Sequence, residues 1–317
     1  MVAGFYHLPQ KDRVFLSLVA QHQPEAAQDL LTYLPSDEAQ RIRENLEEYL
    51  AAEPERWRRD LQGARDGGGE GSECLLYVSD PGWISEALTG ESAAMIGTLL
   101  PKFPKSIVGA ILKDLPKETR RELQEVKFRK IAPTIRDLLR LQVERRFPRV
   151  DLTPLNSDDV LKRVKELSGP NLMILINELG LSEMTRAFAQ VQRSTLRVIL
   201  NRLGTHDAKE LQNRLKDGAQ YTKAVQKDAQ MHILGLDLDK MNSEQLLLEI
   251  GFGVFSGAFG PEDREAAEYF VYRLPPKIGH MLKRYLAERE TAVLPEKIRN
   301  TRGRILDAFI SLKKEFA

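Results

Sequence analysis

The fold of this chain is set by a pattern that is clearest in residues 112–123, which read LKDLPKETRREL. A closing leucine, Leu115, is followed by the break residue Pro116, and a second apolar residue, Leu123, stands eight positions after that leucine. The pattern occurs four times, and the other copies combine Leu34-Pro35 with Ile42, Leu203-Gly204 with Leu211, and Leu274-Pro275 with Leu282. Each copy predicts a helix, a tight break and a second helix.

The residues around each break support this interpretation. The positions three and four before the closing leucine are apolar, as one stripe of a helix requires, and they hold Leu30/Leu31, Ile111/Leu112, Ile199/Leu200 and Phe270/Val271. Proline suits the first turn of the next helix, because an N–H there has no helical partner, and Gly204 acts as a helix stop instead. Five positions after the leucine, Ala39, Ala208 and Gly279 favour close packing, whereas the second copy has Arg120. We therefore expect an all-α fold of helical repeats.

The composition narrows the class of protein. Of 317 residues, 42% are hydrophobic and 29% charged, which is typical of a folded globular chain. The 47 basic and 46 acidic residues leave a net charge of +1, so we expect no nucleic-acid partner and no membrane contact except through another protein. Cys74 is the single cysteine and excludes an intrachain disulfide. With no secretory signal at the start and no long apolar run, we expect a cytoplasmic protein.

Five parts follow from the composition along the chain. An N-terminal helical repeat block (1–62) precedes a glycine-rich linker (63–79), and helical blocks at 80–150 and 151–236 precede a C-terminal helical repeat block (237–317). The linker lacks the flanking strand and the Lys-Ser/Thr helix start of a phosphate-binding loop. A second glycine-rich stretch, residues 251–260, has helical flanks, which favours close helix packing or a hinge over a nucleotide loop.

Residues 113–149 are locally basic, with twelve Lys or Arg against six Asp or Glu. Acidic and apolar residues are interleaved with them. A solvated surface is therefore the favoured interpretation, and a dedicated site for an acidic partner is the alternative.

No pattern in the sequence is typical of catalysis. The histidines have no metal-ligand spacing, and they are His7, His22, His206, His232 and His280. Asp237-Leu-Asp239 resembles the start of a calcium loop but lacks the glycine and the closing acid. Asp158-Asp159 is more typical of a helix cap than of a catalytic carboxylate pair. We expect a non-enzymatic protein with no cofactor and no metal.

Two blocks resemble FliG, the bacterial flagellar motor switch (rotor) protein. Residues 155–167, continuing through Asn171-Leu172 to Phe188 and Leu196, are similar to the C-terminal domain of that family. Block 80–150 is similar to the family's middle domain, with Leu115-Pro116 and a leucine-rich helix after Ile131-Ala132. The resemblance implies an armadillo-like right-handed α-solenoid and a scaffold role in a switch complex. It also implies self-association, and binding to other flagellar switch or basal-body ring proteins at the cytoplasmic face of the inner membrane.

The chain departs from the family where that family makes its best-defined contacts. The middle-domain motif Glu-His-Pro-Gln, which contacts the neighbouring switch protein, is replaced by Lys102-Phe103-Pro104-Lys105. The positions of the charged residues that face the stator hold Asn177, Ser194, Asn201 and Arg202, with Arg193 one position away. The torque residues are therefore not retained, whereas the resemblance still implies a scaffold.

Two sets of residues are our candidates for partner binding. One is Phe103, Pro104 and Lys105, although a phenylalanine before a proline at a helix start also serves as a core staple. The other is Arg193, Arg197 and Arg202, whose spacing suits one side of a helix and equally suits a solvated surface. The alternative function is a soluble adaptor or regulatory α-solenoid unrelated to motility, similar to the helical gating domain of magnesium transporters.

Overall fold

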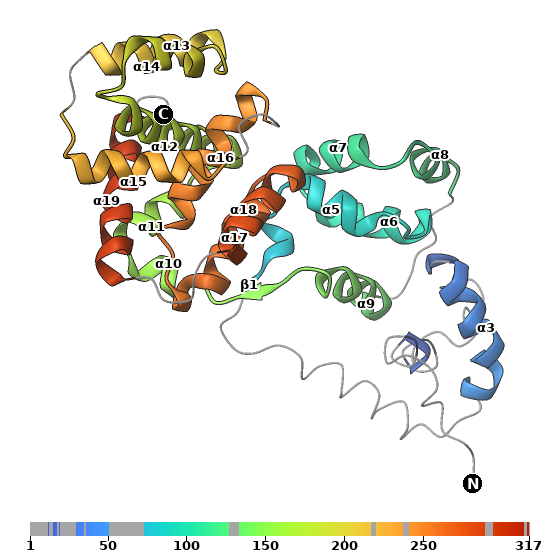
Figure 1. Cartoon of the computed structure of the whole chain (residues 1–317). Coiled ribbons are helices and arrows are strands. Elements are labelled where there is room, and N and C mark those ends of the chain that lie inside the picture. The colour runs from blue at the N-terminus through green and yellow to red at the C-terminus, as the bar shows by residue number, and fades with distance from the viewer. Residues whose placement is uncertain are drawn as a thin grey trace. The chain divides into compact units, whose positions relative to one another are not determined.

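The structure, a computed structural model, describes residues 12, 15–17, 19, 30–34, 36–50, 73–126, 133–216, 220–236, 241–288, 294–313 and 316. The described residues are mainly helical and divide into two compact units, Met1–Val150 and Asp151–Ala317 (Figure 1). The predicted linker core at residues 63–72, His7, His22 and the segment 237–239 lie outside the described residues.

The first unit is a set of short helices closed by a two-stranded sheet. Its elements are η3 (Leu31–Tyr33), α3 (Ser36–Leu50), β1 (Glu73–Cys74), η4 (Leu75–Tyr77), α5 (Pro81–Leu88), α6 (Ala93–Leu99), η5 (Leu100–Lys102), α7 (Lys105–Asp114), α8 (Lys117–Glu125), α9 (Pro133–Glu144) and β2 (Arg149–Val150). β1 pairs antiparallel with β2, with Glu73 opposite Val150. α5 packs on α7, and α6 packs on α8 and α9.

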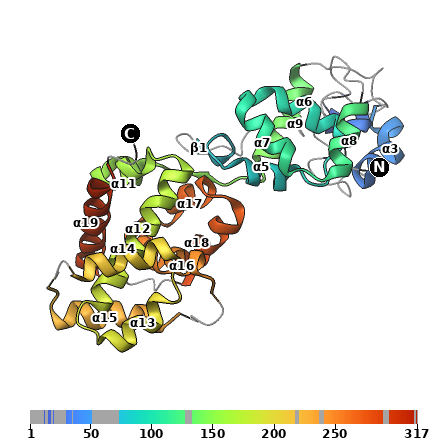
Figure 2. The ribbon, with the colours of Figure 1, turned by 90° about the horizontal axis from the view of Figure 1, so that it is seen from above.

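The second unit surrounds one long helix. Its elements are α10 (Thr153–Ser157), α11 (Asp159–Lys165), α12 (Gly169–Phe188), α13 (Arg193–Leu200), α14 (Thr205–Lys216), α15 (Lys223–Leu234), α16 (Ser243–Ser256), η7 (Pro261–Asp263), α17 (Arg264–Arg273), α18 (Pro276–Glu288) and α19 (Pro295–Ser311). α12 packs against α14, α15, α16 and α19, and Figure 1 shows it between α14 and α15. Figure 2 shows α19 along one side of this unit, beside α11. The blocks 151–236 and 237–317 both lie in this unit.

A crossing of two helix backbones, α12 and α16, lies at the centre of the second unit. A Cβ atom at Gly180 would collide with the carbonyl oxygen of Leu247, and one at Gly251 would collide with that of Ile176. The prediction of close helix packing in residues 251–260 is therefore confirmed. Taken alone, the nearly all-apolar segment 171–179 predicts a short helix, with a separate helix from Leu181. This prediction is wrong, because α12 runs from Gly169 to Phe188. α12 continues through Gly180, because the missing side chain admits α16 without ending the helix.

All four predicted breaks are confirmed. Helix α7 ends before Leu115 and α8 begins at Lys117; the corresponding pairs are η3 with α3, α13 with α14, and α17 with α18. The four closing leucines are buried, with exposed fractions of 5% for Leu34, 2% for Leu115, 8% for Leu203 and 0% for Leu274. The pattern therefore fixes the ends of these helices and anchors each break in the core.

The predicted helix cap at Asp158 is also confirmed. The Oδ1 atom of Asp158 accepts the N–H groups of Val160 and Leu161 at 2.9 and 3.0 Å. In the first unit, Asp80 caps α5 by accepting the N–H of Gly82 at 2.9 Å, and Pro81 is the first residue of that helix. Both carboxylates satisfy N–H groups that a helix start leaves unpaired.

Candidate partner-binding surfaces

The first candidate set lies where η5 passes into α7. The N–H of Phe103 donates to the carbonyl of Leu100 at 3.0 Å and ends η5, and Pro104 is the N-cap of α7. The side chain of Phe103 is half-buried, whereas Pro104 and Lys105 are exposed. The three residues therefore form one short surface segment at the start of α7.

Helix α7 is apolar but only partly covered. Ile111 is the one α7 side chain that the described part of the chain buries fully, while Ile107, Val108 and Leu112 are half-buried. α5 covers the other side, where the Ser85 hydroxyl donates to the carbonyl of Ile111 at 3.1 Å. The half-covered side is continuous with the exposed Pro104 and Lys105. We call Pro104, Lys105, Val108, Gly109 and Leu112 the α7 surface.

The second candidate set lies along α13 and in the turn that follows it. Arg193 is the first residue of α13, and its side chain lies outside the described side chains. Arg197 is exposed, and the neighbouring Val198 is 63% exposed. α13 ends at Leu200, so the exposed Arg202 lies in the following turn and does not extend a stripe along the helix.

Internal ion pairs use three arginines of the basic run at residues 113–149. Arg140 and Arg149 lie 3.1 and 3.7 Å from the buried carboxylate of Glu144, and Arg146 pairs with the buried Glu91. Glu144 also accepts the Tyr77 hydroxyl at 2.5 Å. Burial and this hydrogen bond raise the pKa of Tyr77 to about 12. These arginines therefore hold the first unit together, which favours the non-binding interpretation of the run.

A pocket of about 720 Å³ lies in the first unit, between the start of α6 and the end of α8. Its lining includes Glu91, Glu122 and Glu125. Glu91 is paired with Arg146, and Glu125 lies 3.2 Å from Arg121. Much of the negative charge around this pocket is thus compensated within the chain.

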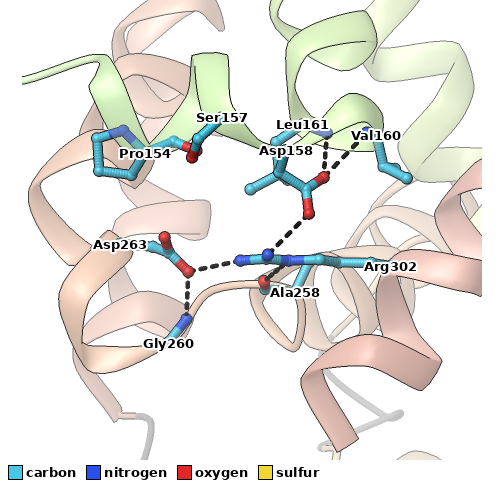
Figure 3. Close-up of polar contacts among 9 residues, drawn as sticks. All are labelled: Pro154, Ser157, Asp158, Val160, Leu161, Ala258, Gly260, Asp263 and Arg302. Carbon is cyan, nitrogen blue, oxygen red and sulfur yellow. Dashed lines mark hydrogen bonds and ion pairs between the residues drawn. The ribbon is translucent and has the colours of Figure 1, made fainter. Parts of the chain in front are cut away.

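Arg302 joins three parts of the second unit (Figure 3). Its guanidinium reaches Asp158 at 2.9 Å, Asp263 at 2.6 Å and the carbonyl of Ala258 at 2.9 Å. Asp263 also accepts the N–H of Gly260 at 2.8 Å. Asp158 thus caps α11 with one carboxylate oxygen and binds Arg302 with the other. Both contacts are structural, which favours the helix-cap interpretation of Asp158-Asp159 over a catalytic carboxylate pair.

A second buried charge lies between α12, α15 and α19. Glu183 is 5% exposed, accepts a hydrogen bond from Arg304, and lies 3.4 Å from Nδ1 of His232. Burial raises the pKa of Glu183, but the His232 hydrogen bond and the charge of Arg304 outweigh it and hold the pKa below its usual range. No local signal in the sequence pairs these residues, because they stand 49 and 121 positions apart.

No protein-family model, curated protein or solved structure matches the chain. Within the described ranges, no group of three or more His, Cys, Asp or Glu side chains is placed to hold a metal ion. Among the helices in those ranges, none is both long and apolar enough to cross a bilayer.

Proposed function

We propose that this protein is a non-enzymatic scaffold that binds partner proteins and neighbouring copies of itself through helical faces, in an assembly similar to the flagellar switch complex. The observation that carries the proposal is the α7 surface, an apolar helix side that its own unit covers only in part. Side chains such as Val108 and Leu112 gain free energy when another protein covers them, and the polar and basic rim sets the orientation of that protein.

The arrangement of the helices supports the finer part of the proposal, an armadillo-like right-handed α-solenoid resembling FliG. Four pairs of helices that stand two positions apart in the chain pack together, namely α5 with α7, α6 with α8, α12 with α14, and α16 with α18. In a solenoid, such packing leaves one face of each helix pair available to the next helix pair or to a partner protein. Torque generation is not part of the proposal, because Asn177 and Asn201 stand where the family has charged residues.

The experiment that tests this proposal is quantitative affinity capture from the native cells. We expect wild-type protein to capture flagellar switch or basal-body ring proteins, and Lys105→Glu to capture at least tenfold less of them. Lys277→Glu is the matched control, because Lys277 is an exposed lysine that follows a proline at the start of α18.

One outcome would reject the rotor assignment, and another would reject the α7 surface as the binding site. Capture of only a transporter or of unrelated soluble proteins would favour the adaptor solenoid. If Lys105→Glu and Lys277→Glu both capture less partner protein by the same factor, the α7 surface is not the binding site.

A further inference from the structure

The pocket in the first unit has a lining that suits a polar, positively charged ligand. Its volume of about 720 Å³ is in the usual range for a small-molecule site. The described lining contains three glutamates, five residues with a hydroxyl group, and no Lys, Arg or His. Two of the glutamates are paired within the chain, but these pairs leave negative charge at the end of α8 and at the start of α6.

The end of α8 carries charge that the chain does not balance. Glu122 and Glu125 stand at the C-terminal end of this helix, where the dipole favours bases, and its last turn contains no basic residue. Glu122 is exposed and makes no ion pair with a described residue. The pair of Glu125 with Arg121 joins two exposed side chains, and such pairs contribute little. A cation beside Glu122 is therefore favoured.

The start of α6 carries a carboxylate that is only half satisfied. Glu91 is 6% exposed, and one of its oxygens pairs with Arg146. Its other oxygen, Oε2, is buried and has no hydrogen-bond donor among the described residues. The charge of Arg146 is also shared with Glu38, which opposes the fall in the pKa of Arg146 that burial causes. A buried carboxylate oxygen without a donor is costly, so Glu91 offers a second place for a cation.

The two acids belong to different helices, which selects a ligand with two charged ends. Glu91 precedes α6, and Glu122 lies in α8. The same lining includes the apolar side chains of Leu34, Ala94 and Val126. Methylene groups gain free energy when they cover such side chains, and an ammonium group supplies three N–H donors. A chain of methylene groups with an ammonium group at each end matches both features.

We propose that the pocket binds a linear aliphatic diamine, with one ammonium group beside Glu122 and the other beside Glu91. The inference goes beyond the proposed function, and it does not depend on which protein covers the α7 surface. The Glu91 carboxylate turns to present Oε2 to the ligand, while Arg146 stays bound to the other oxygen. The hydroxyl groups of Ser36 and Thr119, which also line the pocket, accept further N–H groups.

Isothermal titration calorimetry of the full chain at low ionic strength tests this assignment. The probes are cadaverine, which has an ammonium group at each end, pentylamine, which has one, and pentanol, which has none. We expect cadaverine to bind at one site per chain, with a Kd roughly tenfold below that of pentylamine. Pentanol should give no measurable binding, because it leaves both acids without a counter-charge.

Glu122→Gln removes one of the two charges. This variant should raise the Kd of cadaverine roughly tenfold, to the Kd of pentylamine on the wild-type chain. Its thermal stability should not fall, because the C-terminal end of α8 loses an unfavourable negative charge, so weaker binding does not reflect poor folding. Glu118→Gln is the matched control, because Glu118 is exposed on the same helix and lies outside the described lining. It should leave the Kd unchanged.

A lysine derivative distinguishes a free diamine from a lysine side chain of a partner protein. Nα-acetyl-lysine amide presents one ammonium group on a methylene chain that ends in a peptide group. Cadaverine should bind roughly tenfold more tightly than this compound. If the lysine derivative binds as tightly as cadaverine, the pocket receives a protein side chain and the diamine assignment is wrong.

The assignment is also overturned if cadaverine does not bind, if pentylamine binds equally tightly, or if Glu122→Gln leaves the Kd unchanged. Equal weakening of binding by Glu118→Gln would overturn it as well, because the general charge of α8 would then hold the diamine in place of the pocket.

Discussion

At the residue scale, two glycines determine how α12 and α16 cross. We predict that Gly251→Ala lowers the free energy of unfolding of the second unit by about 1–3 kcal/mol, because the new methyl group must displace the backbone of Ile176. Gly303→Ala, with open space at its Cβ, should instead raise it by about 0.5–1 kcal/mol. Urea denaturation followed by circular dichroism measures both free energies. Tryptophan fluorescence would not report on the second unit, because Trp57 and Trp83 both belong to the first unit. Equal stability of the two variants would contradict the crossing.

Glu183, also at the residue scale, makes the stability of the second unit depend on pH. Its pKa is lower in the folded chain than in the unfolded chain, where the pKa of a glutamate is about 4.3. The pairing therefore stabilises the second unit above that pH and is lost as the pH falls through the lower folded pKa. At pH 7, Glu183→Gln should cost about 3–5 kcal/mol, because the half-buried Arg304 remains without its partner charge.

The cost of Glu183→Gln should shrink when the pH is lowered towards 3. Denaturation curves at pH 7 and pH 3.5 supply the test. A cost that is the same at both values would show that the Glu183 charge does not stabilise the fold.

At the scale of the element, local signals explain most of what could be predicted. The breaks at Leu115-Pro116 and Leu274-Pro275 and the cap at Asp158 each depend on a few adjacent residues, and all were predicted correctly. The continuity of α12 through Gly180 could not be predicted, because it depends on a helix some 70 residues later in the chain. The candidate partner-binding residues stay a prediction, because only their places on the helices are described. Sequence spacing placed Arg202 on the helix of Arg197, whereas α13 ends between them.

The start of α11 allows the cap and the ion pair of Asp158 to be separated. Asp158→Asn keeps an oxygen for the N–H groups of Val160 and Leu161 but removes the charge opposite Arg302. Asp158→Ala removes both, so we predict that it costs about 1 kcal/mol more than the asparagine variant. Chemical denaturation of the two variants measures the difference. A larger cost for asparagine than for alanine would contradict the capping role.

At the scale of the whole molecule, the second unit contains its own core. Leu175, Ile176 and Phe252 are fully buried, and the contacts of Glu183 and Arg302 also lie within residues 151–317. We predict that residues 151–317 alone fold cooperatively, with a helical circular dichroism spectrum and a single sigmoidal denaturation curve. A fragment that gives a gradual, non-cooperative curve would show that this unit needs the first one.

The central claim is that another protein chain covers the α7 surface. The most direct measurement is site-specific photocrosslinking in the native cells, with the photoreactive residue at Val108 and a control at Ile310, which is 58% exposed on α19. We predict that Val108 gives crosslinks to a second copy or to a switch-complex protein, and that Ile310 does not give the same products. Crosslinks from Val108 only to its own chain would contradict the account, because this surface would then be covered from within.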